Sequence, residues 1–461
     1  MENFRIESDS IGQREVPINA YYGVQSLRAR ENFKISGTKT HVEFIRAIVE
    51  IKKAAAIANK NAKAIDEKIA DAMITACDEI LSGKFVEDFI VDAVQGGAGT
   101  SFNMNANEVI SNRAIEILGG KKGDYSIVHP NDHANCGQST NDVFPSAGKI
   151  ATIRFLEKAI LALNDFRRAL ELKAKQFAGV IKMGRTEMQD AVPISFGQSF
   201  NAYANAVKRD TVRFKRAIKE LSVLNMGGTA IGTGITASGE YVKSVVPTLS
   251  EVTGLNLTQA EDLVDATQNL DCFVYVSGIV KACAATLSKI ANDLRLMSSG
   301  PRTGFAEINL PAKQNGSSIM PGKINPVIPE VINQIAFNVI GNDTTVTMAV
   351  EAGQLELNAF EPIIFYCMFE SLEMLTNGVK VFTTDCIEGL TVNEEICEDE
   401  VERSIGIVTA LCPFIGYTKA ASLAKKALKE KKTVRRLLLE EKIVSESELN
   451  CSRVKKLEIY G

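Results

Sequence analysis

Gly316-Ser317-Ser318-Ile319-Met320-Pro321-Gly322-Lys323-Ile324-Asn325-Pro326 is a stretch that cannot form a regular helix or strand. Pro321 and Pro326 each lack a backbone N–H donor, and the two glycines loosen the chain between them. Directly after it, from residue 327 to 340, apolar residues recur at the spacing of a buried helix. The stretch is therefore predicted to be a mobile loop that opens a long buried helix.

The same loop carries groups that recognise anions. It combines two adjacent hydroxyls, an ammonium and an amide: Ser317, Ser318, Lys323 and Asn325. Asn325 is the expected N-cap of the following helix, with Pro326 at its first position. N–H groups at a helix start and a nearby cation both favour a negative ligand. Most Gly/Pro clusters are ordinary turns, but a plain turn has no need of these side chains, so we expect a site for a carboxylate or phosphate.

Other polar loops precede predicted helices. A glycine-rich turn at 96–99 stands before Thr100, and the run 138–142 contains the consecutive polar residues Ser139, Thr140 and Asn141. Each of these residues alone could be a simple N-cap, whereas together they suggest second and third ligand loops. The glycine spacing at 96–99 is not that of a P-loop, because no Gly-Lys-Ser/Thr follows.

Two further stretches need a separate interpretation. Residues 183–193, which include Thr186 and Glu187, read as a polar loop that leads into a helix. The glycine-rich run 227–239 follows a predicted helix rather than a strand, so a dinucleotide-binding fingerprint is not expected there.

Composition limits the classes of partner. The 461 residues carry a net charge of −4 without a long basic cluster, so neither nucleic acid nor an anionic membrane surface is expected to bind. No uninterrupted apolar stretch approaches the length of a bilayer span, and the start of the chain lacks the pattern of a signal peptide. The nine cysteines contain no C-x-x-C and are expected to be reduced. Three histidines are too few for a histidine-rich metal site. We expect a cytoplasmic protein.

Helical periodicity dominates the chain after an irregular entry arm at 1–40. Helices are predicted at 41–64, 67–81, 143–177, 194–224, 263–298, 327–340, 342–361 and 363–383, with shorter charged segments beyond 391. The predicted fold is mainly α, with an N-terminal mixed domain (1–140), a central bundle of long helices (141–392) and a small C-terminal helical domain (393–461). Because the long helices are apolar over much of their circumference, partner subunits are expected to cover them.

With these loops in place, the sequence resembles the aspartase/fumarase superfamily, and within it most closely the aspartate ammonia-lyases. The run 316–326 followed by Glu330 matches the superfamily signature, and residues 96–105 and 138–142 match its other loops. The resemblance extends essentially from end to end. It implies a three-domain homotetramer with a central bundle of long helices, a dicarboxylate substrate, and active sites that each collect loops from three subunits.

Finer features are similar to aspartases rather than fumarases. They are the segment Arg14 to Val24, the run Pro326 to Glu330 and the sequence Gly341-Asn342-Asp343-Thr344-Thr345-Val346-Thr347-Met348. One position departs from part of the family. Fumarases and some aspartases have a histidine after Gly-Arg-Thr, whereas this chain has Glu187, so the role of that histidine does not transfer.

The resemblance implies reversible anti-elimination of ammonia from L-aspartate to give fumarate, with Ser317 as general base. Neutral donors would stabilise the aci-carboxylate intermediate, and other groups would hold the second carboxylate and the ammonium. The substrate-binding residues implied are Thr100, Ser139, Thr140, Asn141, Thr186, Glu187, Ser318, Met320, Lys323 and Asn325. Of these, Lys323, Asn325 and Thr186 are assigned to the second carboxylate, and Asn141 and Glu187 to the ammonium.

Two alternatives remain open. The first is fumarate hydratase or another fumarate-releasing lyase of the same fold. The second is a catalytically silent structural tetramer, against which the presence of Ser317, Lys323 and Asn325 weighs. No cofactor is expected, and the sequence leaves room for a regulatory divalent cation.

Overall fold

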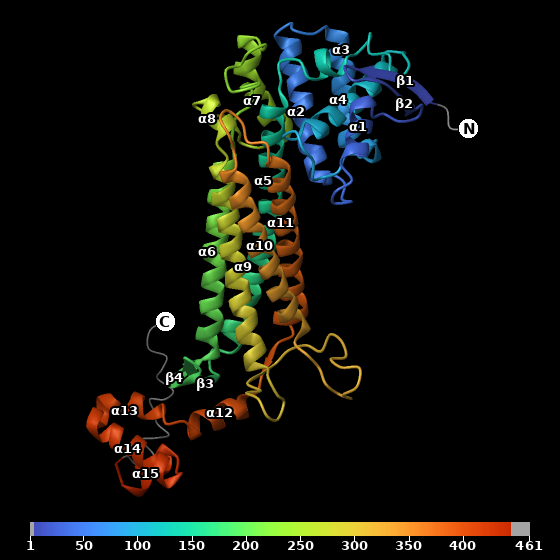
Figure 1. Ribbon diagram of the computed structural model, residues 1–461. Helices are drawn as coiled ribbons and strands as arrows, with labels where there is room; N and C mark the ends of the chain where they lie inside the picture. Colours follow the sequence, from blue (N-terminus) through green and yellow to red (C-terminus); the bar gives the residue numbers. More distant parts are fainter. Residues whose placement is uncertain (1–3, 444–461) are drawn as a thin grey trace. The chain divides into compact units, whose positions relative to one another are not determined.

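The computed structural model describes residues 4–443, and these are mostly helical (Figure 1). Short 3₁₀ or π-helical turns occur at Val86–Asp88, Pro130–Ala134 and Thr383–Ile387. The helices are α1 (Val24–Asn32), α2 (Val42–Asn61), α3 (Glu67–Leu81), α4 (Thr100–Ile117), α5 (Thr140–Gln176), α6 (Phe196–Leu221), α7 (Gly239–Thr253), α8 (Leu263–Gln268), α9 (Asp271–Met297), α10 (Val327–Glu351), α11 (Glu361–Phe382), α12 (Glu394–Arg403), α13 (Ile407–Ile415), α14 (Tyr417–Glu430) and α15 (Val434–Glu440).

The strands form only two-stranded pairs in the described part of the chain. Three pairs are antiparallel and one, β5 with β6, is parallel. The strands are β1 (Phe4–Asp9), β2 (Gly12–Pro17), β3 (Ile181–Thr186), β4 (Gln189–Ser195), β5 (Val223–Leu224), β6 (Thr258–Gln259), β7 (Ile308–Asn309) and β8 (Thr391–Val392). The predicted mainly α fold without a large sheet is therefore confirmed.

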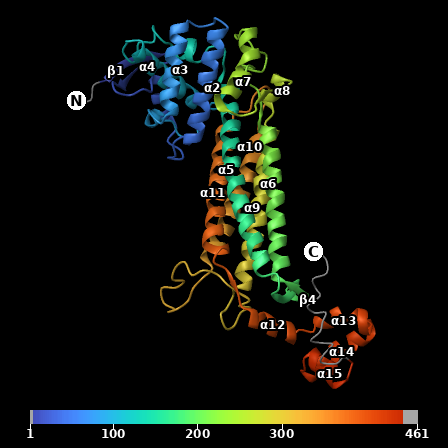
Figure 2. The same cartoon turned by 180° about the vertical axis from the view of Figure 1, so that it is seen from behind.

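The chain divides into two compact units, each built from three separate segments. Unit 1 contains residues 1–161, 210–284 and 337–376, and unit 2 contains residues 162–209, 285–336 and 377–461. Helices α5, α6, α9, α10 and α11 contribute residues to both units, and in each unit their segments lie side by side (Figures 1 and 2). The predicted bundle of long helices is present. The three-domain division at 140 and 392 remains a prediction.

Aromatic side chains fill the core of each unit. In unit 1 the ring of Phe44 on α2 lies 5.0 Å from Phe144 on α5 and 5.3 Å from Phe365 on α11, measured between ring centroids. In unit 2 the rings of Phe166 and Phe382 stack at 5.0 Å. Burial of such rings stabilises the packing of helices that are distant in sequence.

Two stretches predicted to be irregular contain strands. The entry arm at 1–40 holds the β1–β2 hairpin and α1, and residues 183–193 lie within the β3–β4 hairpin. The first hairpin turns where Asp9 Oδ1 accepts hydrogen bonds from the N–H groups of Ile11 and Gly12. Both errors concern short strands, whose alternation spans only six or seven residues.

Two predicted helices are interrupted. The helix expected at 263–298 breaks at Asn269, whose extended backbone separates α8 from α9. The helix expected at 342–361 ends at Glu351. There the side-chain amide of Asn358 donates to the carbonyls of Ala349 and Val350 and satisfies the end of α10. Periodicity alone could not locate either break, because apolar residues continue across both.

Helix α9 is long and apolar enough, by length and composition, to cross a membrane, which differs from the sequence-based expectation. Core helices of soluble proteins meet the same criterion, and half of its apolar window is buried in the structure. Its polar side chains Ser277 and Lys281 bond to Asp343 on α10. These hydrogen bonds join α9 to α10, as expected for a helix that packs inside a bundle.

Candidate functional site

The Ser317 hydroxyl lies in a loop that aims backbone N–H groups at it. Ser317 Oγ accepts hydrogen bonds from the N–H of Ile319 at 3.2 Å and of Met320 at 2.9 Å. Ser317 is half-buried, whereas Ser318, Met320 and Lys323 are exposed. Hydrogen bonds to an oxygen favour its negatively charged form. The loop therefore already supplies two donors to the oxygen that would act as base.

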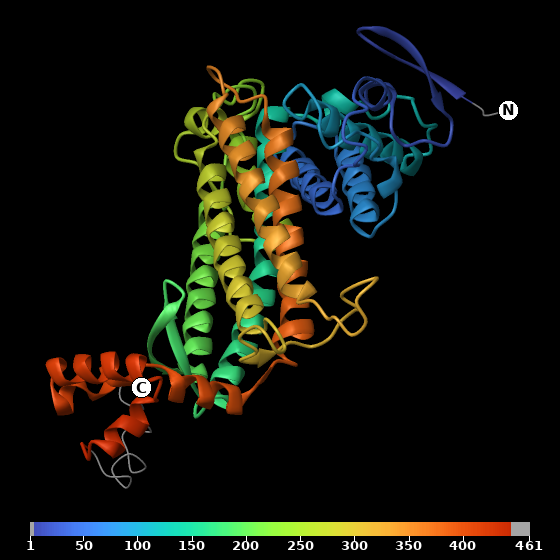
Figure 3. The ribbon, with the colours of Figure 1, turned by 60° about the horizontal axis from the view of Figure 1, so that its bottom comes forward.

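The two ends of this loop are joined to each other. The N–H of Gly316 donates to the carbonyl of Lys323 at 2.8 Å, and the side-chain amide of Asn325 donates to the carbonyl of Gly316 at 2.8 Å. A Cβ at position 316 would lie 2.7 Å from the N of Asn325, so only glycine fits this close approach. The amide group of Asn325 thus closes the loop, and its role as N-cap of α10, which begins at Val327, stays a prediction. Figure 3 shows the loop between α9 and α10.

Thr186 and Glu187 lie at the tip of the β3–β4 hairpin in unit 2. Thr186 pairs with Gln189, and the two residues between them, Glu187 and Met188, have positive φ angles of 52° and 66°. Such a pair of angles matches a two-residue hairpin turn whose twist suits the strands, although residues other than glycine pay some strain there. Both Thr186 and Glu187 are exposed. The tip thus presents a hydroxyl and a carboxylate side by side.

A buried ionic cluster anchors this hairpin. Arg185 donates to Glu307 at 2.7 Å and to Glu400 on α12 at 2.9 Å, and Lys182 lies 3.1 Å from Glu307. Glu307 is completely buried. Since Arg185 is occupied in this way, it does not pair with Glu187. Among the described residues no ion pair is found for Glu187, so its charge is available at the tip.

In unit 1, Ser139, Thr140 and Asn141 lie at the start of α5 and are held by side-chain hydrogen bonds. Thr140 Oγ1 accepts from the amide of Asn103 at 3.0 Å, and Asn141 donates to the carbonyl of Ala230 at 2.8 Å. Ser139 Oγ accepts from the N–H of Asn141 at 3.2 Å. Thr140 is buried, and Ser139 and Asn141 are half-buried.

Two buried ionisable residues, Asp142 and Lys52, support the start of α5. Asp142 accepts hydrogen bonds from the N–H groups of Ser139, Gly227 and Thr229. The glycine-rich run 227–239 therefore supplies backbone donors to this buried carboxylate. Burial raises the pKa of Asp142 to about 6, although those N–H groups oppose the rise. Lys52 on α2 donates at 2.9 Å to both Asn135 and Gln138. Burial lowers the pKa of Lys52 to about 7, and Asp142 partly counteracts this.

Thr100 is the first residue of α4 and is exposed. The chain reaches it through Gly97, Ala98 and Gly99, all with positive φ, and the N–H of Thr100 donates to the carbonyl of Gly97. A Cβ at position 99 would overlap the ring of Phe144, so glycine is required there by close packing.

The candidate residues thus fall into two groups. Unit 1 brings Ser139, Thr140 and Asn141 together at one helix start and places Thr100 at the start of a second helix, α4, which Asn103 links to Thr140. Unit 2 contains the Ser317 loop, with Ser318, Met320, Lys323 and Asn325, and the hairpin tip with Thr186 and Glu187. Each group has its own supporting hydrogen bonds.

Residues 4–443 hold no group of three or more His, Cys, Asp and Glu side chains arranged to bind a metal ion. The cysteines in this range are free thiols, as expected for reduced residues, and Cys451 lies outside it. The regulatory cation remains a prediction without a located site.

Comparison with known proteins shows the family of this chain. The family described as Lyase matches residues 12–341, and the one described as Fumarase C C-terminus matches residues 407–451. Aspartate ammonia-lyase of Bacillus subtilis is 51% identical over 97% of this chain and 94% of its own length. The enzyme of the same name from Helicobacter pylori is 52% identical over 97% of this chain and 96% of its own.

This chain belongs to the aspartase/fumarase superfamily of lyases. Solved structures of the superfamily share its fold. A Brucella melitensis protein described as fumarate lyase:delta crystallin bound to cobalt has a TM-score of 0.93 and 48% identity, with 95% of this chain and 96% of that one covered. A class II fumarase from Schistosoma mansoni has a TM-score of 0.95 and 34% identity, with 99% of each chain covered.

Sequence reasoning missed the residues that support the candidate site. Lys52, Arg185 and Glu307 carry no motif that marks them as structural partners of the loops. Lys52 did leave a signal, because it lies four residues after Ile48 and three before Ala55, in phase with the apolar face of its helix. A lysine in that position predicts a buried cation with polar partners.

Proposed function

We propose that this protein removes ammonia reversibly from L-aspartate to give fumarate. The observation that carries the proposal is about 50% identity to aspartate ammonia-lyases over nearly the whole chain, with the loop residues intact. The Ser317 environment supports it independently, because a serine needs nearby N–H donors to act as base.

In the proposed mechanism, the alkoxide form of Ser317 takes a proton from the carbon next to one substrate carboxylate and becomes the neutral hydroxyl. Two negative charges then reside on that one carboxylate group of the intermediate, so a dense set of donors is needed around it. Thr100, Ser139, Thr140 and the loop around Ser318 and Met320 provide them. The carbon–nitrogen bond breaks in the second step, ammonia leaves, and the double bond of fumarate forms.

The remaining substrate groups need different partners. Lys323, Asn325 and Thr186 bind the second carboxylate, where an exposed ammonium and neutral donors provide both charge and orientation. Asn141 and Glu187 face the substrate ammonium. A carboxylate at the hairpin tip attracts a cationic amine, which favours an amino acid over a hydroxy acid such as malate.

The site is proposed to form in a cytoplasmic homotetramer, with loops from three subunits around each substrate. Exposed apolar side chains on α10 support the association of subunits, among them Phe337, which is 65% exposed. The chemistry itself is proposed to need no cofactor, and a divalent cation would act only as a regulator. Dialysis against EDTA should then leave turnover at saturating aspartate unchanged.

A fumarate hydratase activity is the second candidate, favoured by the match to the Schistosoma mansoni fumarase. Absorbance of fumarate, followed with purified protein and either L-aspartate or L-malate, separates the two. Production of fumarate from aspartate alone supports the proposal. Fumarate from malate alone contradicts it, and turnover of neither substrate would favour a catalytically silent tetramer.

A further inference from the structure

A cavity of about 230 Å³ lies in unit 1, apart from the residues assigned to the lyase site. Its walls come from the segment before α2, the approach to α4, and the first half of α11. For scale, an engineered protein cavity of about 150 Å³ holds benzene. The space therefore suits one ring with a short substituent.

The floor of the cavity is a rigid group of aromatic rings. Phe44 is central, with its centroid 4.8 Å from that of Phe102 and 5.2 Å from that of Phe369. These three side chains are at most 5% exposed. Glycines make room for other rings of the floor: a Cβ at Gly148 would overlap Phe365. Rings fixed in this way offer a preformed apolar surface.

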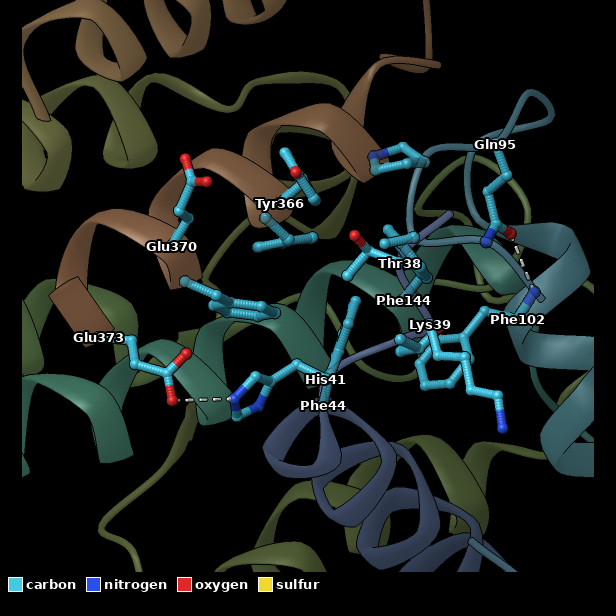
Figure 4. A pocket seen from close by; sticks show the side chains of 15 residues that line it. Thr38, Lys39, His41, Phe44, Gln95, Phe102, Phe144, Tyr366, Glu370 and Glu373 are labelled. Atoms are coloured by element: carbon cyan, nitrogen blue, oxygen red, sulfur yellow. Dashed lines mark hydrogen bonds and ion pairs between the residues drawn. The ribbon is translucent and has the colours of Figure 1, made fainter. Parts of the chain in front are cut away.

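One end of the cavity is acidic. Figure 4 shows Glu370, Glu373 and His41 on one side, with Gln95 and Phe102 on the other. Glu370 accepts a hydrogen bond from the neutral amide of Asn342 at 2.9 Å, and Glu373 lies 3.6 Å from Nε2 of His41.

No lysine or arginine of the lining neutralises the negative charge of this acidic end. Lys39 is the only lysine or arginine among the lining residues, and its ammonium is paired with Glu87, outside the lining, at 2.6 Å. His41 already accepts the N–H of Glu43 at Nδ1, and it carries charge only when it is protonated. Tyr366, the remaining titratable residue of the lining, is neutral in its protonated form. The charge of the acidic end is therefore complementary to a cation.

A buried hydroxyl in the lining lacks a partner. Thr40 is 8% exposed, and its Oγ1 makes no hydrogen bond with the described residues. Leaving a buried hydroxyl unpaired is costly, so its retention in a cavity wall is consistent with a ligand that forms a hydrogen bond with it. The hydroxyl oxygen can accept that bond from an ammonium group.

We propose that this cavity binds a small organic ammonium ion, with its apolar body against the phenylalanine rings and its nitrogen near Glu370 and Glu373. Aromatic faces and carboxylates both attract a cation, and the rings exclude water from its body. An anion of the same size is repelled by the two glutamates. The site does not depend on the proposed lyase reaction, since none of the residues assigned to that reaction lines it.

Isothermal titration of the full-length protein with benzylammonium chloride tests the proposal, with benzyl alcohol and benzoate as probes of matched size. We expect saturable binding of one benzylammonium per chain, at least about fivefold weaker binding of the alcohol, and no binding of benzoate. Equal binding of the three probes, or no saturable binding of benzylammonium, would overturn the proposal. The second result is expected if a partner subunit fills the cavity.

Substitutions of residues that line the cavity test whether benzylammonium binds there. Glu370→Gln and Glu373→Gln should each weaken benzylammonium binding about fivefold, because glutamine keeps the size of the side chain and removes its charge. Ala93→Leu should abolish it by filling the space that Ala93 lines. Glu251→Gln, at an exposed position on α7, is the matched control and should bind as the wild type does. Unchanged binding in all three cavity variants, with unchanged circular dichroism spectra, would place the ligand elsewhere.

Discussion

Ser317 and Glu187 are the single residues on which the proposed chemistry depends most. Ser317 Oγ has two backbone N–H partners within its own loop, which also contains the cation Lys323. Glu187 projects from a strained turn and has no ion-pair partner among the described residues. Strained positions that are kept exposed are characteristic of functional groups.

Ser317→Ala should leave the assembly intact and reduce kcat by a factor of about 10³, the scale typical of a lost general base. The change removes one oxygen from a half-buried surface loop, so folding should not suffer. Initial rates of fumarate formation and size-exclusion chromatography measure the two effects. A variant that keeps a tenth of the wild-type kcat would exclude Ser317 as the base.

Glu187→Gln should raise KM for aspartate about tenfold while fumarate inhibits as well as before or better. A carboxylate attracts the substrate ammonium and repels the product dianion, so its neutralisation shifts the two affinities in opposite directions. Arg185 cannot mask this effect, because it is held by Glu307 and Glu400. Parallel changes in aspartate KM and fumarate inhibition would show that Glu187 only orients the loop. Glu395→Gln on α12 is a suitable exposed control.

At the scale of elements, buried polar clusters fix the segments that present the site. Arg185 of the β3–β4 hairpin bonds to Glu307 and to Glu400 on α12. At the start of α5, Lys52 donates to Gln138, and Asp142 accepts from the N–H of Ser139. Removing one member of a buried ionic cluster leaves its partner charged and poorly solvated. Both clusters therefore couple stability to the geometry of the site.

Arg185→Met should lower the free energy of unfolding by about 3 kcal/mol, because Glu307 would be left with Lys182 alone. The matched control is Arg403→Met, which breaks an exposed pair with Asp399 on α12 and should cost less than about 1 kcal/mol. Urea unfolding followed by circular dichroism gives both values. Equal losses in the two variants would mean that the buried cluster does not stabilise the hairpin.

Lys52→Met should change the pH dependence of stability. The pKa of Lys52 is about 7 in the folded protein and near its usual 10.5 when unfolded, so between these values the unfolded chain binds the extra proton and the wild type gains stability as pH rises. The variant lacks this gain, which amounts to at most about 1.4 kcal/mol per pH unit. Urea unfolding at pH 7, 8 and 9 measures it.

Lys53→Met, which removes the neighbouring lysine from its pair with Asp78, is the control for that experiment. Its difference from the wild type should stay nearly constant over the same pH range. If the two variants behave alike, burial does not control the charge of Lys52. Asp142 contributes in the opposite direction at lower pH: its pKa is raised, so stability falls as pH rises from 3.8 towards 6.

At the scale of the whole molecule, the long helices leave apolar side chains uncovered within a single chain. On α10, Phe337 and Met348 are 65% and 64% exposed, and Leu172 on α5 is 66% exposed. Isolated exposed residues are ordinary, but a series along bundle helices is the basis of our proposal that subunits cover these surfaces. The lyase site is proposed to be completed by such association.

Phe337→Asp should dissociate the proposed tetramer, because a carboxylate would have to be buried in the proposed apolar interface. Light scattering after size-exclusion chromatography should show a smaller species, and fumarate formation should fall with it. Glu251→Lys changes charge at an exposed position on α7 and should leave the mass unchanged. A tetramer of wild-type mass in the Phe337 variant would place the interface elsewhere.

Local signals in the sequence determined the main helices and the loop at residues 316–326. Helices α2, α3, α5 and α6 begin and end within about three residues of their predicted limits, since a helix is specified by periodicity within one segment. The run 316–326 was predicted as a loop because glycine and proline act on the backbone directly, whatever surrounds them.

Only the tertiary structure decided the features that depend on distant contacts. The β3–β4 hairpin is anchored by Glu307 and Glu400, more than a hundred residues away, and Lys52 bonds to Gln138 across 86 positions. The aromatic cavity likewise joins α2, α4, α5 and α11. A single sequence does not show which buried charges or rings will meet, because that is fixed by how helices pack rather than by the neighbours of each residue along the chain.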